Sequence, residues 1–243
     1  MIDQYFTKIH ELLETIQQNQ MWTLQQVAEK TARALQKDGI IQLFGAGHSH
    51  LFGEEVFYRA GGLVPIKPIL EEDLMLHRGA VRSSQFERSN EYAAAFVQTL
   101  DIQPNDVLFV SSTSGRNPVP IEVAQYAKDK GAFVVAMTSL SYSQSQESRH
   151  HSGRRLFEVA DVTIDNLSVK GDAVLNHDKV KVPFAPTSTV IGTCVINAIM
   201  AETVQFLAEW GVEPPVLLSG NIDGADDHNE KLIDRYRNRI PML

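Results

Sequence analysis

Val107-Leu108-Phe109-Val110, followed directly by Ser111-Ser112-Thr113-Ser114-Gly115-Arg116-Asn117-Pro118, is the stretch of this 243-residue chain that decides its fold. The first four residues form a short apolar run, which is typical of a buried strand. Pro118 and Pro120 suit the first turn of a helix, and the helical pattern that follows, over residues 121–130, ends at Gly131. The stretch therefore predicts a strand, a hydroxyl-rich loop and a helix in succession.

The same succession recurs along the chain. Apolar runs that predict strands lie at residues 40–44, 63–70, 107–110, 133–137 and 162–164, and helical patterns lie at residues 51–60, 90–100 and 121–130. Pro65 and Pro68 place the second strand at an edge of the sheet or in an irregular position. Strands that alternate with helices predict an α/β fold with a parallel sheet covered on both faces.

Helices are also predicted at both ends of the chain. Residues 2–35 carry apolar side chains at helical spacing and indicate two amphipathic helices with a break near Asn19 or Gln20. After Gly171 the alternation stops, until hydroxyl residues at 187–189 predict the N-cap of a long helix at 190–210, with a last helix at 229–238. Because no linker or repeat is present, we expect a single domain over 1–243. Its parts are N-terminal helices at 1–38, an α/β core at 39–210 and a C-terminal extension at 211–243.

Composition narrows the class of protein. With 43% hydrophobic and 21% charged residues the chain is typical of globular proteins, and its net charge of −8 argues against an extended nucleic-acid surface. No apolar run reaches the roughly 18 residues that span a membrane, and the N-terminus has no leader pattern. We therefore expect a cytoplasmic protein that binds neither nucleic acid nor membrane. The single cysteine, Cys194, is predicted to be a buried thiol in a reducing compartment.

Three loops are predicted at the carboxyl ends of the strands, where α/β proteins bind ligands. Loop Ser111–Asn117 combines hydroxyls with a helix N-terminus, which can hold an anion without many cations. Residues 45–50 allow close backbone approach, and residues 187–189 add hydroxyls. A simpler interpretation of the first loop is a serine-rich helix cap. A nucleotide cofactor is a less favoured alternative: His50 stands where a dinucleotide motif has its third glycine, although Glu71 lies at about the distance of a ribose-binding acid.

Two of these loops together resemble the SIS (sugar isomerase) family. Its members carry a glycine-rich loop after the first strand and an S-x-S-G-x-[ST] loop after a later strand. The motif here is Ser112-Thr113-Ser114-Gly115-Arg116-Asn117, with Asn117 in place of the usual hydroxyl residue. The likeness runs from the N-terminal helices to about Trp210. It implies a three-layer α/β/α sandwich with a five-stranded parallel sheet and a phosphosugar ligand.

The resemblance also implies a homodimer or homotetramer, because SIS proteins commonly place their sites near subunit boundaries. No DNA-binding helix-turn-helix precedes the domain, which separates the chain from SIS transcription regulators. Ser114-Gly115-Arg116 and Gly45-Ala46-Gly47 resemble the N-acetylmuramic acid 6-phosphate etherases, but Arg59 stands near the position of the glutamate that those enzymes use. The greatest likeness is to stand-alone single-SIS bacterial proteins without an assigned reaction.

The predicted phosphosugar contacts are donors in the three loops: Gly47, His48, Ser49, Ser112, Thr113, Ser114, Asn117, Ser188 and Thr189. Isomerisation of a sugar also needs a base that moves a proton between neighbouring carbons. Glu55 is preferred over Glu54 for this task, and His77 and His228 are the histidines predicted to act at the sugar. For each of them a solvated or structural residue is the simpler interpretation.

No metal and no cofactor is predicted, because neither His48-x-His50 nor His150-His151 belongs to a recognisable zinc motif. The sequence thus predicts a protein that binds a small-molecule phosphosugar and isomerises a sugar phosphate or an amino-sugar phosphate. Two alternatives stay open. One is a non-catalytic phosphosugar sensor, and the other is a lyase similar to the N-acetylmuramic acid 6-phosphate etherases.

Overall fold

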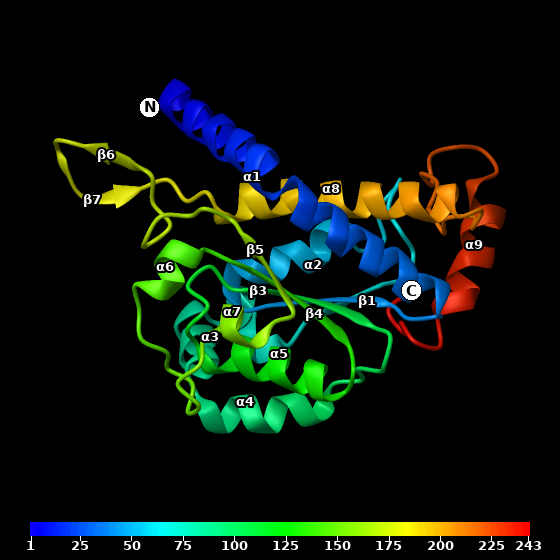
Figure 1. Ribbon diagram of the computed structural model, residues 1–243, viewed down its shortest axis with the longest axis horizontal. Coiled ribbons are helices and arrows are strands. Elements are labelled where there is room, and N and C mark those ends of the chain that lie inside the picture. Colours follow the sequence, from blue (N-terminus) through cyan, green and yellow to red (C-terminus); the bar gives the residue numbers. More distant parts are fainter.

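A five-stranded parallel sheet organises the chain in the computed structural model, which describes residues 1–243 (Figure 1). The strand order is β2-β1-β3-β4-β5. The strands are β1 (Ile41–Gly45), β2 (Ile66–Ile69), β3 (Val107–Ser111), β4 (Phe133–Thr138) and β5 (Val162–Asp165). All five predicted strands are present, and β2, which contains Pro68, lies at an edge as the prolines predict.

Helices cover both faces of the sheet and complete the predicted three layers (Figure 1). On one face lie α1 (Ile2–Gln36), α2 (Leu51–Val56) and α8 (Ser188–Glu209). On the other lie α3 (Ala80–Glu87), α4 (Asn90–Phe96), α5 (Pro118–Asp129) and α7 (Leu156–Val159). As predicted, α5 begins at Pro118, whose missing N–H costs nothing at the first helical position.

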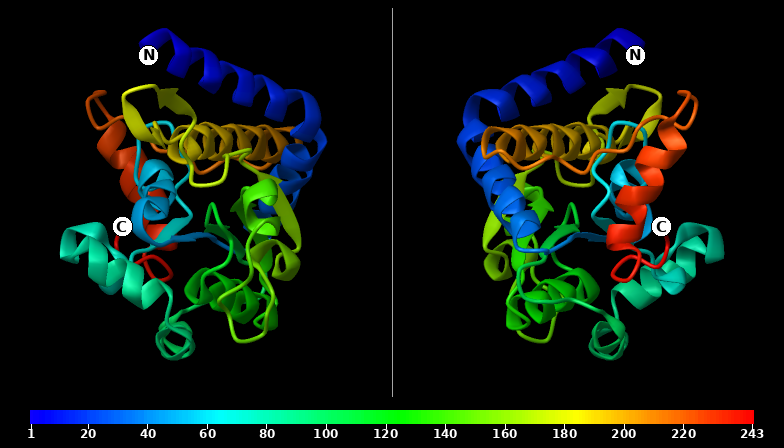
Figure 2. Two further views of the ribbon diagram at one scale, coloured as in Figure 1. Left: turned by 90° about the vertical axis from the view of Figure 1, so that its left-hand side faces the viewer. Right: turned by 90° about the vertical axis from the view of Figure 1, so that its right-hand side faces the viewer.

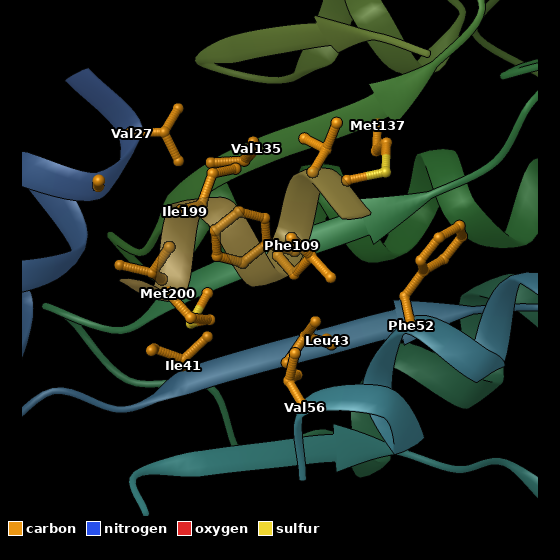
Figure 3. Close-up of a cluster of buried hydrophobic side chains, with 14 of the residues drawn as sticks. Val27, Ile41, Leu43, Phe52, Val56, Phe109, Val135, Met137, Ile199 and Met200 are labelled. Atoms are coloured by element: carbon orange, nitrogen blue, oxygen red, sulfur yellow. The ribbon is translucent and has the colours of Figure 1, made fainter. Parts of the chain in front are cut away.

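The core lies on both sides of the sheet. On one side, Leu43, Phe109 and Val135 of the strands belong to a buried cluster that also contains Val27 of α1 and Ile199 of α8 (Figure 3). This cluster has 24 buried residues and the cluster on the opposite face has 20. Since both faces are covered to a similar extent, β1, β3 and β4 carry apolar residues at nearly every position.

A single helix, α1, stands where the sequence predicted two, so the expected break was wrong. Residues 2–36 contain no glycine or proline, and Asn19 and Gln20 each cost a helix well under about 1 kcal/mol. The Gln20 amide donates to the carbonyl oxygen of Asp165 at 2.7 Å and accepts from its N–H at 2.9 Å. This contact with β5 stabilises the helix where it was expected to end. Figure 2 shows that α1 changes direction along its length as it crosses α8.

Helix α8 is long and apolar enough, by length and a mean hydropathy of 1.6, to cross a membrane, which the sequence reading did not expect. Its buried residues, including Ile191, Ile196 and Ile199, pack in the core cluster between α1 and the sheet. The buried core helix of a globular protein meets the same criteria of length and hydropathy.

Cys194 of α8 is exposed, so the predicted buried thiol was wrong. Because apolar residues surround most of α8, their spacing does not reveal which side faces the sheet.

Shorter elements complete the chain. An antiparallel hairpin of β6 (Leu175–His177) and β7 (Val180–Phe184) lies where no element was predicted, and α9 (Ala225–Tyr236) begins four residues earlier than expected. Arg239, beyond α9, reaches the fully buried carboxylate of Asp106 at 2.8 Å. The other elements are α6 (Leu140–Gln144), η1 (Gly47–His50), η2 (Glu72–Leu74), η3 (Leu76–Arg78) and η4 (Val97–Thr99).

Candidate functional site

The winding of the sheet reverses between β1 and β3. The chain passes from β1 to β2 on one side and then returns to place β3 on the other side, where Gly45 pairs with Ser111. The loops that follow β1 and β3 therefore leave the sheet side by side, at the same carboxyl edge. Such a switch point is where open α/β sheets bind their ligands.

The hydroxyl-rich loop after β3 is fixed through its carbonyl oxygens. The Thr113 carbonyl accepts from the Ser139 N–H at 3.0 Å and from the Thr138 hydroxyl at 3.1 Å. Gly115 has φ +56° and its carbonyl accepts from the Leu156 N–H at 2.8 Å. A Cβ on Gly115 would lie 2.8 Å from the hydroxyls of Thr138 and Ser143, so no larger residue fits. Because neighbouring segments occupy these carbonyls, the polar groups of the loop that stay available are its N–H and hydroxyl donors.

These donors have no partner within the chain. The backbone N–H groups of Thr113, Ser114, Arg116 and Asn117 make no backbone or side-chain hydrogen bond, and neither do the hydroxyls of Ser111, Ser112, Thr113 and Ser114. The Ser111 hydroxyl is fully buried. Polar groups in such positions normally have partners. A concentration of unpaired donors around a left-handed glycine beside a helix N-terminus is suited to an anion.

Asn117, the residue that departs from the S-x-S-G-x-[ST] motif, is buried and engaged inside the protein. Its side-chain oxygen accepts from Arg149 Nη1 at 2.9 Å, and its amide lies near the carboxylate of Glu87. The Arg149 N–H also donates to the carbonyl of Arg116 at 2.8 Å. The Asn117 side chain is therefore engaged through its oxygen, which links the loop to Arg149.

Positive charge exceeds negative charge beside this loop. Burial raises the pKa of the Glu87 carboxyl, although Asn117, Arg88 and Arg149 pull it down. Burial lowers the pKa of the Arg149 guanidinium, and the positive charges of Arg116 and Arg88 lower it further. Three guanidinium groups thus lie near one carboxylate. This local excess favours an anion in a chain whose net charge is −8.

The glycine-rich loop after β1 folds closely back on itself. A Cβ on Gly45 would overlap the backbone of Ser49, and Gly47 has φ +58°, so both positions require glycine. His48 is exposed, while the Nδ1 of His50 hydrogen-bonds the carbonyl of Gly47. The structure places Gly47, His48 and Ser49 next to the loop after β3, as predicted from their positions after neighbouring strands.

The N-terminus of α8 lies at the same edge but already has an anion. The Asp172 carboxylate accepts from the N–H groups of Thr187 and Ser188 at 3.0 and 3.1 Å, and from the Ser188 hydroxyl at 2.6 Å. The helix is thus capped by Asp172, not by the side chain of its own first residues as the sequence predicted. Ser188 is engaged, whereas the Thr189 hydroxyl has no partner in the chain.

The two glutamates of α2 face different surroundings. Glu55 accepts from Arg59 and, at 2.8 Å, from the Asn197 amide of α8, and Arg59 and Asn197 line a cavity of about 330 Å³ beside α8. Glu54 lies 3.7 Å from Nε2 of His50 in the glycine-rich loop. Glu54 is thus the glutamate near the glycine-rich loop, while Glu55 pairs with Arg59 and Asn197.

The predicted histidines are far apart. His77 is exposed, 3.5 Å from Glu72, and its neighbour Leu76 lies 3.7 Å from where a Cβ on Gly47 would be, so His77 belongs to the edge that carries the loops. Nε2 of His228, on α9, donates to the carbonyl of Val216 at 3.0 Å. Helix α9 packs against Ile40 at the opposite end of β1, so the chain does not bring its own His228 to the loops.

Glu71, the candidate ribose-binding acid of the alternative nucleotide site, already accepts a hydrogen bond within the chain. The Tyr92 hydroxyl donates to Glu71 at 2.8 Å, and burial together with this carboxylate raises the pKa of Tyr92. A ribose hydroxyl would have to share this carboxylate with Tyr92. Sequence reasoning also missed how Glu87, Arg149 and Asp172 hold the edge together. Arg149 lies 32 residues from Asn117 and Asp172 lies 16 from Ser188, and no local pattern joins them.

Comparison with known proteins agrees with this geometry. The SIS domain family matches residues 4–139. A UPF0309 protein of Halalkalibacterium halodurans is 63% identical over 243 residues, which cover all of this chain and 97% of that protein. Among solved structures, a phosphoheptose isomerase from Neisseria gonorrhoeae aligns with a TM-score of 0.53 and 16% identity, covering 85% of this chain and 97% of that one.

The Vibrio vulnificus NanR protein complexed with ManNAc-6P aligns with a TM-score of 0.51 and 14% identity, covering all of this chain and 69% of that one. At these identities the two structural likenesses concern the fold. The sequence matches decide membership, because one covers more than half of the chain and the other covers all of it. The chain belongs to the SIS domain family and, within it, to the UPF0309 proteins.

Proposed function

We propose that this chain binds the phosphate of a sugar phosphate in loop Ser111–Asn117 and isomerises the sugar. The observation that supports it is the set of four backbone N–H groups and four hydroxyls in this loop that have no partner in the chain. A phosphate dianion has three terminal oxygens that accept hydrogen bonds, so it matches a site rich in donors and poor in acceptors. The two structural neighbours named above are a phosphoheptose isomerase and a protein complexed with ManNAc-6P, which is consistent with a phosphosugar ligand.

The residues proposed for the phosphate are Ser112, Thr113 and Ser114, with Gly47, His48 and Ser49 approaching from the neighbouring loop. Asn117 and Ser188 are proposed to orient the edge instead of touching the ligand, since both are bonded within the chain. Thr189 remains a proposed contact.

Proton transfer at the sugar requires a base within reach of the bound carbon atoms. Within one chain, Glu54 with His50 is the pair beside the loops, and His77 belongs to the same edge. We propose Glu54 as the base in place of Glu55, whose charge is matched by Arg59. His228 can serve this site only from a second copy, which fits the proposed homodimer or homotetramer.

Solvent-deuterium exchange followed by NMR tests the reaction. The protein is incubated in D2O with a panel of ketose, aldose and amino-sugar phosphates, and deuterium at C1 or C2 is followed. Exchange with interconversion supports an isomerase. Binding without exchange indicates a sensor, and release of lactate from N-acetylmuramic acid 6-phosphate indicates an etherase-like lyase. Thermal stabilisation by NAD but by no phosphosugar would contradict the proposal.

A paired substitution tests the site. Ser112→Ala with Ser114→Ala removes two hydroxyls but leaves the core unchanged, so the variant should fold and lose the thermal stabilisation that a phosphosugar gives to the wild type. Ser145→Ala with Ser219→Ala is the matched control, because these serines lie outside the loop. Equal phosphosugar affinity in the two double variants and the wild type would refute the site.

The organisation of the chain is proposed as one domain over residues 1–243 in the cytoplasm. Limited proteolysis should yield no stable fragment that ends near residue 38 or begins near residue 211, because α1 packs in the main core and Arg239 is bound to Asp106. Light scattering on the purified chain measures its oligomeric state.

A further inference from the structure

Glu122 of α5 and the adjacent His150 and His151 form a cluster on the helical layer opposite α8. One potential metal-ligand atom from each residue lies within 4.8 Å of the others. Glu122 Oε2 is 2.6 Å from Nε2 of His150, and the two imidazole rings are 4.1 Å apart between centroids. We propose that these three side chains bind a divalent transition metal, with Zn²⁺ the ion that fits best.

The surroundings of both rings support this proposal. Nδ1 of His150 lies 2.7 Å from the hydroxyl of Ser152, and Nδ1 of His151 lies 3.3 Å from the side-chain oxygen of Asn90. The Ser152 N–H also donates to Nδ1 of His150 at 3.3 Å, so both rings are held in place, and a metal would replace the Nε2 proton that His150 shares with Glu122. Histidines that bind metals typically have their second nitrogen held in this way. A hydrogen bond between Glu122 and His150 alone would not explain why Asn90 also holds the imidazole of His151 beside them.

The donor set and the burial also suit zinc. Two imidazole nitrogens and one carboxylate oxygen are ligands that Zn²⁺ accepts in a tetrahedral site, with water at the fourth position. Zinc–ligand bonds of about 2.0–2.2 Å place ligand atoms roughly 3.3 Å apart, so the contact between Glu122 and His150 would open modestly as the metal replaces the shared proton. His150 is buried and His151 is exposed, which gives the ion an anchored side and an open side.

A metal here would connect three segments that are distant in sequence. Glu122 belongs to α5, Asn90 begins α4, and the histidines lie in the segment between α6 and α7. That segment also donates from Arg149 to the Arg116 carbonyl, and Leu156, the first residue of α7, donates to the Gly115 carbonyl. The ion would therefore stabilise the segment that holds the loop after β3. Metal binding itself does not depend on what that loop binds.

Metal titration of EDTA-treated full-length protein tests the proposal. Isothermal titration with Zn²⁺ at pH 7.5 is expected to show one site per chain. His151→Ala and Glu122→Gln each remove one ligand and should weaken the affinity of that site at least about tenfold. His151 is exposed and Gln is close in size to Glu, so both variants should keep their fold, which circular dichroism checks.

Two control variants test binding at other surface groups. His177→Ala removes an exposed histidine of the β6–β7 hairpin, and Cys194→Ser removes the exposed thiol. Both should bind Zn²⁺ as the wild type does. Substitution with Co²⁺ should give visible absorption bands of a low-coordinate site in the wild type and lose them in His151→Ala. Absence of Zn²⁺ binding, or unchanged affinity in both ligand variants, would overturn the proposal and leave a hydrogen-bonded His–Glu pair.

Discussion

Arg149 Nη1 donates to the side-chain oxygen of Asn117 at 2.9 Å, and its backbone N–H donates to the carbonyl of Arg116. One residue thereby holds two consecutive positions of the loop after β3 at the start of α5. Carbonyls of this loop and the Asn117 oxygen thus have partners in the chain, whereas four of its N–H groups and four of its hydroxyls have none. The arrangement of donors is a property of the segment around Arg149 as much as of the serines themselves.

Arg149→Ala should weaken phosphosugar binding without removing any proposed ligand contact. Loss of a hydrogen bond from a charged group costs about 1.5–3 kcal/mol. Because part of that cost would appear as a less well ordered loop, the Kd for a phosphosugar is expected to rise roughly tenfold. Arg154→Ala, in the same segment but bonded to Gln125, is the control. Titration calorimetry measures both. Equal affinities would show that the loop keeps its shape without Arg149.

Gly115→Ala should destabilise the protein more than Gly153→Ala. Both glycines have positive φ, +56° and +73°, so both variants carry a backbone penalty of about 1–2 kcal/mol. Only at Gly115 would the new Cβ meet Thr138 and Ser143 at 2.8 Å, whereas at Gly153 it meets nothing within 4 Å. The overlap adds about 1–3 kcal/mol. Urea denaturation gives the two free energies of unfolding, and similar values would contradict the packing argument.

Asp172→Ala should destabilise the fold by roughly 1 kcal/mol or more, because α8 loses its cap and a favourable charge at its N-terminus. Asp172 has φ +52°, which asparagine tolerates, so Asp172→Asn keeps the backbone and part of the hydrogen bonding while removing the charge. Its loss of stability should be intermediate. Asp178→Asn, on the exposed turn of the hairpin, should change nothing measurable in the melting temperature.

Glu87→Gln should stabilise the protein relative to the wild type as pH rises. Burial raises the pKa of Glu87 above its ordinary value of 4.5, so the fold favours the neutral carboxyl. The stability due to that preference is fully present below the unfolded pKa and is lost as pH rises through the folded pKa. The difference in melting temperature, variant minus wild type, should therefore grow as pH rises above about 4.5. Glu147→Gln, an exposed control, should show a constant difference.

Local patterns were enough to predict the sheet and the position of the two loops. The strand near Val107 and the helix that starts at Pro118 are specified by consecutive residues, and the parallel arrangement follows from their alternation. Patterns failed where tertiary contacts decide. Gln20 continues α1 because β5 supplies partners for its amide, and no signal within residues 2–36 reveals that.

The candidate site was predicted less completely, for the same physical reason. Ser112 and Ser114 predict a loop that binds an anion. The sequence does not distinguish a free asparagine side chain from one that is bonded within the chain, and the side-chain oxygen of Asn117 is bonded to Arg149. Glu54 and Glu55 are adjacent, so a difference of about 100° around the helix decides which one faces the loops. Glu122 and its partner His150 are 28 residues apart, so no local pattern joins them in the sequence.

The carboxylate that caps α8 makes the two helix ends at this edge unequal. Asp172 neutralises one of them from within the chain, so the end of α5 is the one left open to an outside anion. A monophosphate would find a complete seat there, whereas the second phosphate of a bisphosphate would meet a fixed negative charge. We therefore expect the proposed site to select against doubly phosphorylated sugars through Asp172, a residue outside the proposed ligand contacts.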